Sequence, residues 1–103
     1  MENSEAIKLL HSLQTLIKND NKEAIYQMMT NDFKSRVSLE NYLRLEKYRI
    51  NLSLPLCLVD IYEAHTDKVM IRAKQASHSD HDIFANMLFV KEEDLWKFSG
   101  TLL

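Results

Sequence analysis

The segment 78–82, with the sequence His-Ser-Asp-His-Asp, gathers side chains that can bind a divalent metal ion. A polar turn between two strands also collects His and Asp, and no third histidine is near it in the sequence. His65 and His78 lie at opposite ends of one predicted strand, about 30 Å apart at roughly 3.3 Å per residue. They therefore cannot share an ion within one chain, and we expect neither a metal ion nor another cofactor.

Thiol chemistry is the second possibility, and it depends on the single cysteine, Cys57. A reactive thiolate needs a basic neighbour, whereas Leu56 and Leu58 flank this residue. We therefore expect Cys57 to be a small buried side chain. A lone cysteine cannot form an internal disulfide bond, and the first residues, Met-Glu-Asn-Ser-Glu, are unlike a secretory signal. Both features predict a cytoplasmic protein.

The composition argues against several other functions. A chain of 103 residues predicts one domain, 1–103, and 46% hydrophobic residues suffice for a single core. The net charge of −2, with no cluster of Lys and Arg, argues against nucleic acid and membrane partners. Gly100 is the only glycine, so a glycine-rich loop that binds nucleotide phosphates is not expected.

The positions of the apolar residues predict three helices followed by four strands. The helices are expected at about 4–18, at about 24–29 and from a cap at Ser38 onward, with Phe33 and Val37 in an irregular link. Alternating or continuous apolar residues predict strands at 56–63, 68–76, 83–91 and 95–102. In 68–76 the alternation puts Val69, Ile71 and Ala73 on one face and Met70, Arg72 and Lys74 on the other. This order predicts an α+β fold, with three N-terminal helices packed on a curved, four-stranded, mostly antiparallel sheet.

The last predicted strand has the clearest pattern of the chain. Trp96 and Phe98 alternate with Lys97 and Ser99, which predicts one aromatic face and one face in water. We expect the two aromatic side chains to face the helices and to be largely buried.

These elements resemble the nuclear transport factor 2-like superfamily, which has a cone-shaped α+β fold. The similar parts are the final hairpin, 90–100, the break between the first two helices, 18–24, and the Thr-Asn-Asp-Phe of 30–33. The resemblance covers nearly the whole chain. It implies a curved sheet around a long N-terminal helix, often a pocket at the mouth of the cone, and frequent dimers through the outer sheet face. Isomerases, dehydratases, cyclases and non-catalytic domains share this scaffold, so the fold does not determine the activity.

The resemblance also implies candidate site residues, because catalytic members place an acid–base carboxylate or histidine inside the cone. The catalytic candidates are Asp60, Tyr62 and Arg72, and the pocket-lining candidates are Tyr42, Asn86 and Trp96. The alternative is that Asp60 and Arg72 form a cross-strand pair on the outer face of the sheet, and we favour this alternative.

We expect a small binding or interaction domain without catalytic activity, which forms a homodimer. Its further partner is a small apolar ligand in the cone or a protein on the sheet. The homodimer is expected because apolar residues lie on both sheet faces, and this chain has too few residues for a second covering layer. Met70, with either Phe84 and Leu88 or Met87 and Phe89, forms the uncovered set. Two alternatives stay open: an isomerase, dehydratase or cyclase that uses a carboxylate inside the cone, and an assembly or immunity-type module.

Overall fold

The computed structural model describes residues 1–77 and 80–102, and in this part of the chain four α-helices precede four strands. The helices are α1 (Asn3–Lys18), α2 (Lys22–Met28), α3 (Asn31–Arg36) and α4 (Leu39–Arg44), followed by the short 3-10 helix η1 (Glu46–Tyr48). The strands are β1 (Leu56–His65), β2 (Lys68–Gln75), β3 (Ile83–Glu92) and β4 (Leu95–Leu102). The predicted α+β class and the four predicted strands are therefore confirmed.

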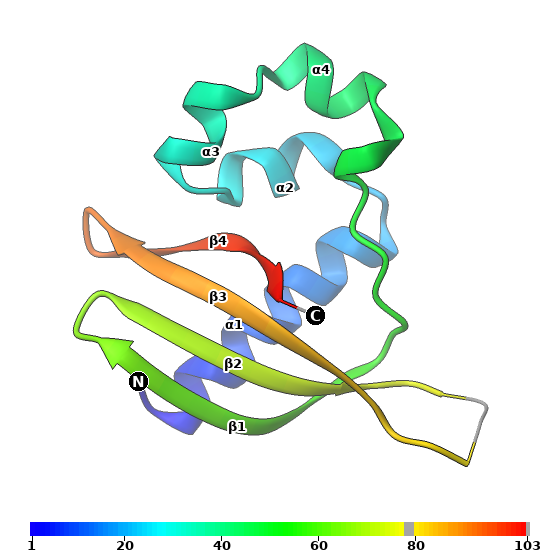
Figure 1. Cartoon of the computed structure of the whole chain (residues 1–103), viewed down its shortest axis with the longest axis vertical. Coiled ribbons are helices and arrows are strands. Elements are labelled where there is room, and N and C mark those ends of the chain that lie inside the picture. The colour runs from blue at the N-terminus through cyan, green and yellow to red at the C-terminus, as the bar shows by residue number, and fades with distance from the viewer. Residues whose placement is uncertain (78–79, 103) are drawn as a thin grey trace.

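The four strands form one open antiparallel sheet in the order β1-β2-β3-β4 (Figure 1). Each strand pairs with the next one in the sequence, as a meander requires. A single parallel bridge joins Met29 to Phe98 and ties the end of α2 to the edge strand β4. The helices α2 to α4 accordingly lie beyond the β4 edge rather than over the sheet (Figure 1).

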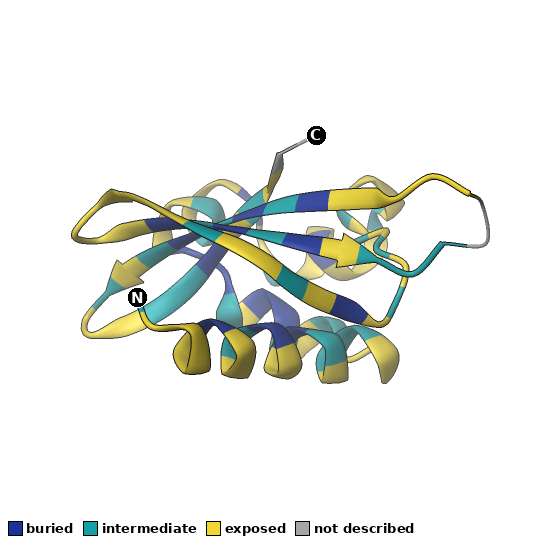
Figure 2. Cartoon of the chain, turned by 90° about the horizontal axis from the view of Figure 1, so that it is seen from below, coloured by how far each residue is buried: buried dark blue, intermediate teal, exposed yellow. Residues whose placement is uncertain are grey.

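Helix α1 covers one face of the sheet (Figure 2). Its buried residues, Ala6, Leu10 and Leu13, are four and three positions apart, which places them on one side of the helix. No helix of the described residues lies over the opposite face of the sheet. We call this uncovered surface the open face.

The face of the sheet that α1 covers holds the centre of the core. Alternate residues of the strands are buried there: Val69, Ile71, Ala73, Ala85, Met87, Phe89 and Phe98. The rings of Phe89 and Phe98 meet edge to face, with 5.5 Å between their centroids. The predicted alternation of β2 is thus confirmed, and large side chains fill the space between α1 and the sheet.

The helix count differs from the prediction of three, because 31–36 forms α3 instead of an irregular link. The hydroxyl of Thr30 accepts a hydrogen bond from the backbone N–H of Phe33 at 3.2 Å and so caps this helix. The Thr-Asn-Asp sequence directly follows Met29, the C-cap of α2, and was expected only to end that helix, and a helix of six residues is too short to give a periodic pattern. The predicted cap at Ser38 is confirmed, since its hydroxyl accepts from the N–H of Asn41 at 3.2 Å.

Four aromatic rings join α2, α3, α4 and η1 to one another. They belong to Tyr26, Phe33, Tyr42 and Tyr48, and neighbouring centroids are 5.4 to 6.4 Å apart. The hydroxyl of Tyr26 donates to the backbone carbonyl of Val37 at 2.7 Å, which satisfies its only donor. This cluster holds the short helices together beside the sheet.

None of the described helices is long and apolar enough to span a membrane.

Candidate functional site

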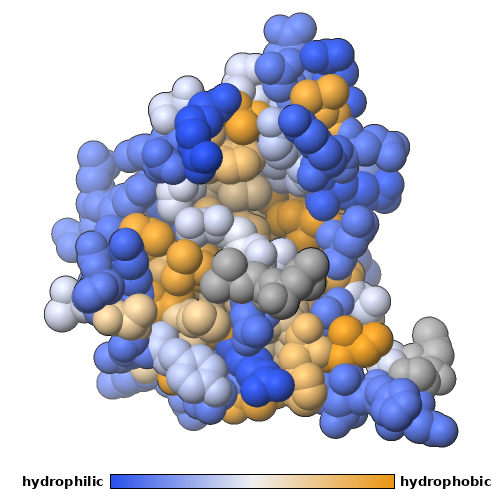
Figure 3. Space-filling model, in the orientation of Figure 1, coloured by the Kyte–Doolittle hydropathy of each residue, from blue (hydrophilic) through white to orange (hydrophobic). Residues whose placement is uncertain are grey.

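The open face carries most of the candidate residues that the strands supply. Two rows of side chains cross strands β1, β2 and β3 there. The apolar row consists of Tyr62, Met70 and Leu88, which lie opposite one another in the strand register. The polar row lies beside it and consists of Asp60, Arg72 and Asn86. In the space-filling view, apolar and strongly polar side chains lie together on this face (Figure 3).

A β-bulge in β1 determines which way Asp60 points. Leu56 and Leu58 face the core, and strict alternation would turn Asp60 inward after them. The register shifts between Leu58 and Asp60, with Val59 as the additional residue. After the shift Ile61 packs against the core, and Asp60 and Tyr62 point to the open face. The bulge therefore keeps the Asp60 carboxylate out of the space beneath the sheet.

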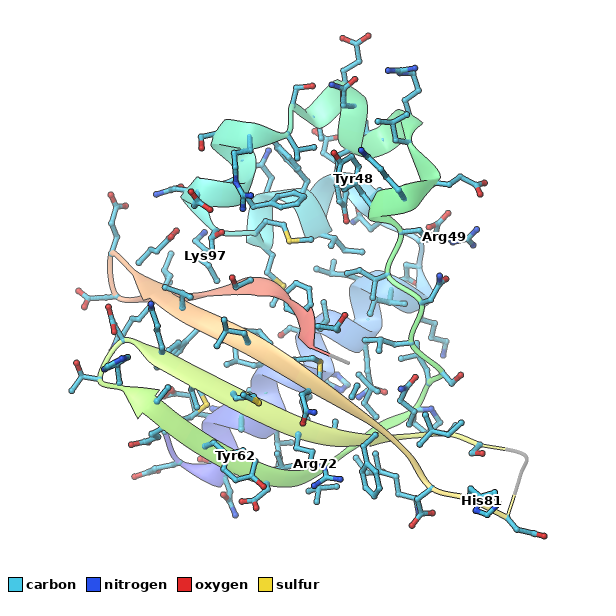
Figure 4. The ribbon with its side chains drawn as sticks, viewed as in Figure 1. Tyr48, Arg49, Tyr62, Arg72, His81 and Lys97 are labelled. Carbon is cyan, nitrogen blue, oxygen red and sulfur yellow. The ribbon has the colours of Figure 1, made fainter. Side chains whose placement is uncertain are left out.

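Asp60 and Arg72 face each other across two strands, as a cross-strand pair requires, but they form no ion pair among the described residues. A carboxylate oxygen of Asp60 instead accepts a hydrogen bond from the backbone N–H of Ile61, at 2.9 Å. The guanidinium of Arg72 lies over the ring of Phe84, 4.2 Å from its centroid. Tyr62 and Arg72 project from the same face (Figure 4).

One donor on this face has no acceptor. The Nε of Arg72 is buried and has no hydrogen-bond partner within the described part of the chain. A buried donor without a partner costs about 1–3 kcal/mol, and more when it is charged. The protein's own atoms cover this Nε, so the cost falls on the folded chain itself.

The exposure of the carboxylates bears on acid–base chemistry. Asp60 is exposed, and no Asp or Glu is buried in residues 1–77 and 80–102. A carboxylate that acts as a general acid or base is normally held in a desolvated pocket within reach of its substrate. Asp60, Tyr62 and Arg72 lie together, as predicted, but on an uncovered surface, where their arrangement suits binding better than catalysis.

The three pocket-lining candidates lie in three different places. Asn86 is in the polar row on the open face. Trp96 is on the face that α1 covers, and its Nε1 donates to the carboxylate of Glu5 in α1 at 2.8 Å. Trp96 keeps part of its surface exposed, whereas its neighbour Phe98 is buried. Both contact the core, as predicted, but Trp96 and Asn86 cannot line one cavity with Tyr42.

Tyr42 alone lines a pocket, which has a volume of about 510 Å³. The pocket lies between the end of α1, the start of α2, and the chain from α4 to the segment before β1. Burial raises the pKa of the Tyr42 phenol above its ordinary value. Tyr48 and Arg49, which also line the pocket, lie where the helices give way to that segment (Figure 4).

The single cysteine is exposed, so the prediction of a buried side chain is wrong. Leu56 and Leu58 take the inward positions of the strand, and alternation places Cys57 between them on the opposite side. It lies opposite Lys74 of β2 on the open face.

The segment with the metal-ligand pattern lies partly outside the described residues, because His78 and Ser79 are not among them. Asp82 forms an ion pair with Lys74, with 3.0 Å between oxygen and nitrogen. Among the residues that are described, no three His, Cys, Asp or Glu side chains gather as metal ligands would.

Sequence reasoning did not settle which apolar residues of β3 are uncovered. The structure places Phe84 and Leu88 on the open face and buries Met87 and Phe89. It also did not find the contact of Phe84 with Arg72, although Phe84 lies only two residues from Asn86, the partner of Arg72 on the adjacent strand, and on the same face. The pocket beside Tyr48 had no such signal, since it depends on how three separate segments meet.

Comparison of the chain with protein-family models and with curated proteins gives no match.

Proposed function

We propose that this chain is a small binding protein that works as a homodimer, joined through the open face of its sheet. The observation that carries the proposal is the apolar row of Tyr62, Met70 and Leu88, which lies on an uncovered sheet face with part of its surface in water. The charged side chain of Arg72 lies beside this row, with its guanidinium over the ring of Phe84.

The apolar side chains around Arg72 support an interface of substantial size. Tyr62 is 46% exposed, and Met70 and Leu88 beside it have part of their surface in water. These three residues form a continuous row over three strands, and Phe84, which is 36% exposed, lies on the other side of the polar row. Apolar patches of this kind mark interaction surfaces in proteins that are otherwise soluble.

The charges of the polar row favour a second copy of the same chain as the binding partner of the open face. Asp60 and Arg72 carry opposite charges, and neither forms an ion pair with another described residue. A two-fold axis parallel to the strands, between β1 and β2, would place Asp60 of each copy against Arg72 of the other. The contact between Asp60 and Arg72 then forms twice, as in an isologous interface, where both copies use the same surface.

We also propose that the chain has the cone-like shape of the nuclear transport factor 2-like superfamily. The order of helices before a four-stranded meander supports this, as does the long helix α1 packed against one sheet face. Within that superfamily the geometry of the open face favours a binding protein over an isomerase, dehydratase or cyclase.

Met70→Asp tests the homodimer, because it places a charge in the middle of the apolar row. Sedimentation velocity of the wild type should show a dimer at micromolar concentration. The variant should stay folded and dissociate at least about 30-fold more readily, the effect of a central interface residue. The control is Ile7→Asp, which adds the same charge at a residue of α1 that is 53% exposed and lies away from the open face.

The Ile7→Asp variant should remain dimeric. A wild type that stays monomeric at several hundred micromolar would overturn the homodimer. A dimer that Ile7→Asp disrupts and Met70→Asp leaves intact would show that the chain associates through its helices instead.

A further inference from the structure

We infer that the pocket beside Tyr42 is a binding site for an amphipathic anion, a molecule with an apolar chain and one negatively charged end. No residue of the four strands lines this pocket. It is thus separate from the open face, and the inference is independent of the proposed homodimer.

Apolar and polar side chains both line the pocket. The apolar ones include Ile17, Ile25, Leu45, Ile50 and Leu52, all of which are buried or half-buried. The rings of Tyr42 and Tyr48 stack with 6.1 Å between their centroids and form an aromatic wall. The volume of about 510 Å³ falls in the range of about 300–1,000 Å³ that is typical of small-molecule sites.

Positive charge gathers around this apolar space. Four cationic side chains line the pocket, Lys18, Lys22, Arg44 and Arg49, against two carboxylates, Asp20 and Glu46. None of these six side chains takes part in an ion pair with another described residue. The excess of cations is notable because the whole chain has a net charge of −2. A cleft with an excess of one sign of charge attracts ligands of the opposite sign.

The two properties together define the ligand. The apolar walls favour an aliphatic or aromatic chain, and the cations favour a single anionic group at the end of that chain. Lys22 is the best anchor for this group, because its side chain is half-buried while the other three cations are exposed. A charge-assisted hydrogen bond strengthens as its surroundings lose water.

Isothermal titration calorimetry with a matched set of probes tests the inference. Decanoate should bind saturably, and decyltrimethylammonium, with the same chain and the opposite charge, should not. If the chain lies inside the pocket, affinity should rise by up to about fourfold for each methylene added from octanoate to decanoate. Amide chemical shifts should change in α2, in α4 and in residues 45–52, and stay unchanged on β2 and β3.

The variant Lys22→Gln/Arg49→Gln tests the cations. It should weaken decanoate binding by about tenfold or more, since each lost charge-assisted contact accounts for part of the affinity. The control variant Lys8→Gln/Lys68→Gln makes the same change in net charge at exposed residues that do not line the pocket, and it should bind as the wild type does.

Three results would overturn the inference. They are no saturable binding of decanoate, equal binding of the cationic probe, and chemical-shift changes that map to the open face instead of the pocket. Decanoate that binds Lys22→Gln/Arg49→Gln with wild-type affinity would also contradict the inference, because the cations would then have no role in binding.

Discussion

The two faces of the sheet are made by the same strands and have opposite chemical characters. On the face that α1 covers, every strand residue at the centre is apolar and fully buried, as Ile71 and Phe89 show. On the open face, apolar side chains such as Met70 and Leu88 stand beside a charged row that contains Arg72.

This difference indicates a division of roles along each strand. Side chains that point to the covered face stabilise the fold, and side chains that point to the open face are available to contact another chain. The comparison predicts that neighbouring residues of β3 will respond to the same substitution in different ways. The loss of folding stability should be large on the covered face and small on the open face.

Phe89→Ala should give the largest loss of stability. Phe89 is fully buried and contacts Phe98, so truncation should lower the free energy of unfolding by about 3–5 kcal/mol. Leu88→Ala, one residue away on the open face, should lower it by about 1 kcal/mol. Urea denaturation in the monomeric Met70→Asp background measures both without a contribution from association. Equal losses at the two positions would abolish the distinction between the faces.

Trp96→Ala should have an intermediate effect. Its ring packs at the border of the core and its Nε1 donates to Glu5, but part of its surface is exposed. We expect a loss of about 2–3 kcal/mol, below the value for a fully buried aromatic residue. Glu5→Gln keeps an acceptor for the indole and should cost less than 1 kcal/mol by a rough estimate. A Trp96→Ala loss below that of Glu5→Gln would place the ring outside the core.

The sequence predicted which side chains point to the same face of the sheet where apolar and polar residues alternate along a strand. The alternation of Val69, Ile71 and Ala73 identified the covered face of β2 before the structure did. In β1 the sequence did not show the register shift at Val59, because no local sequence signal fixes the position of a bulge. Helix α3 was missed because its cap, Thr30, is also an ordinary helix end.

The candidate site was predictable in the same limited way. Asp60 and Arg72 lie opposite each other on neighbouring strands, as the sequence predicted from the order and length of the strands. Their position on the open face, and the contact of Arg72 with Phe84, depend on the bulge and on pairing between strands. The pocket beside Tyr42 needs three distant segments to meet, which no pattern within a short stretch of sequence describes.

Tyr42→Phe should produce the smallest effect, and only at alkaline pH. Burial raises the pKa of Tyr42 in the folded state, so the folded protein keeps this proton when the unfolded chain begins to lose it. The contribution of Tyr42 is fully present below about pH 10 and is lost as the pH rises towards the folded-state pKa. The stability of the wild type should therefore fall relative to Tyr42→Phe above about pH 10. Parallel stability curves would show that the phenol is in contact with water.

Charge exchange in the polar row is the most direct test of the homodimer. The three variants are Asp60→Arg, Arg72→Asp and the double variant Asp60→Arg/Arg72→Asp, and sedimentation equilibrium measures the dimer dissociation constant of each. Each single variant should weaken the dimer, because like charges then meet across the two-fold axis, and the double variant should restore much of it. A matched exchange of the exposed helical pair, Asp32→Arg/Arg36→Asp, should leave the dissociation constant unchanged. Equal dissociation constants for the wild type and all three variants of the polar row would contradict an interface on the open face.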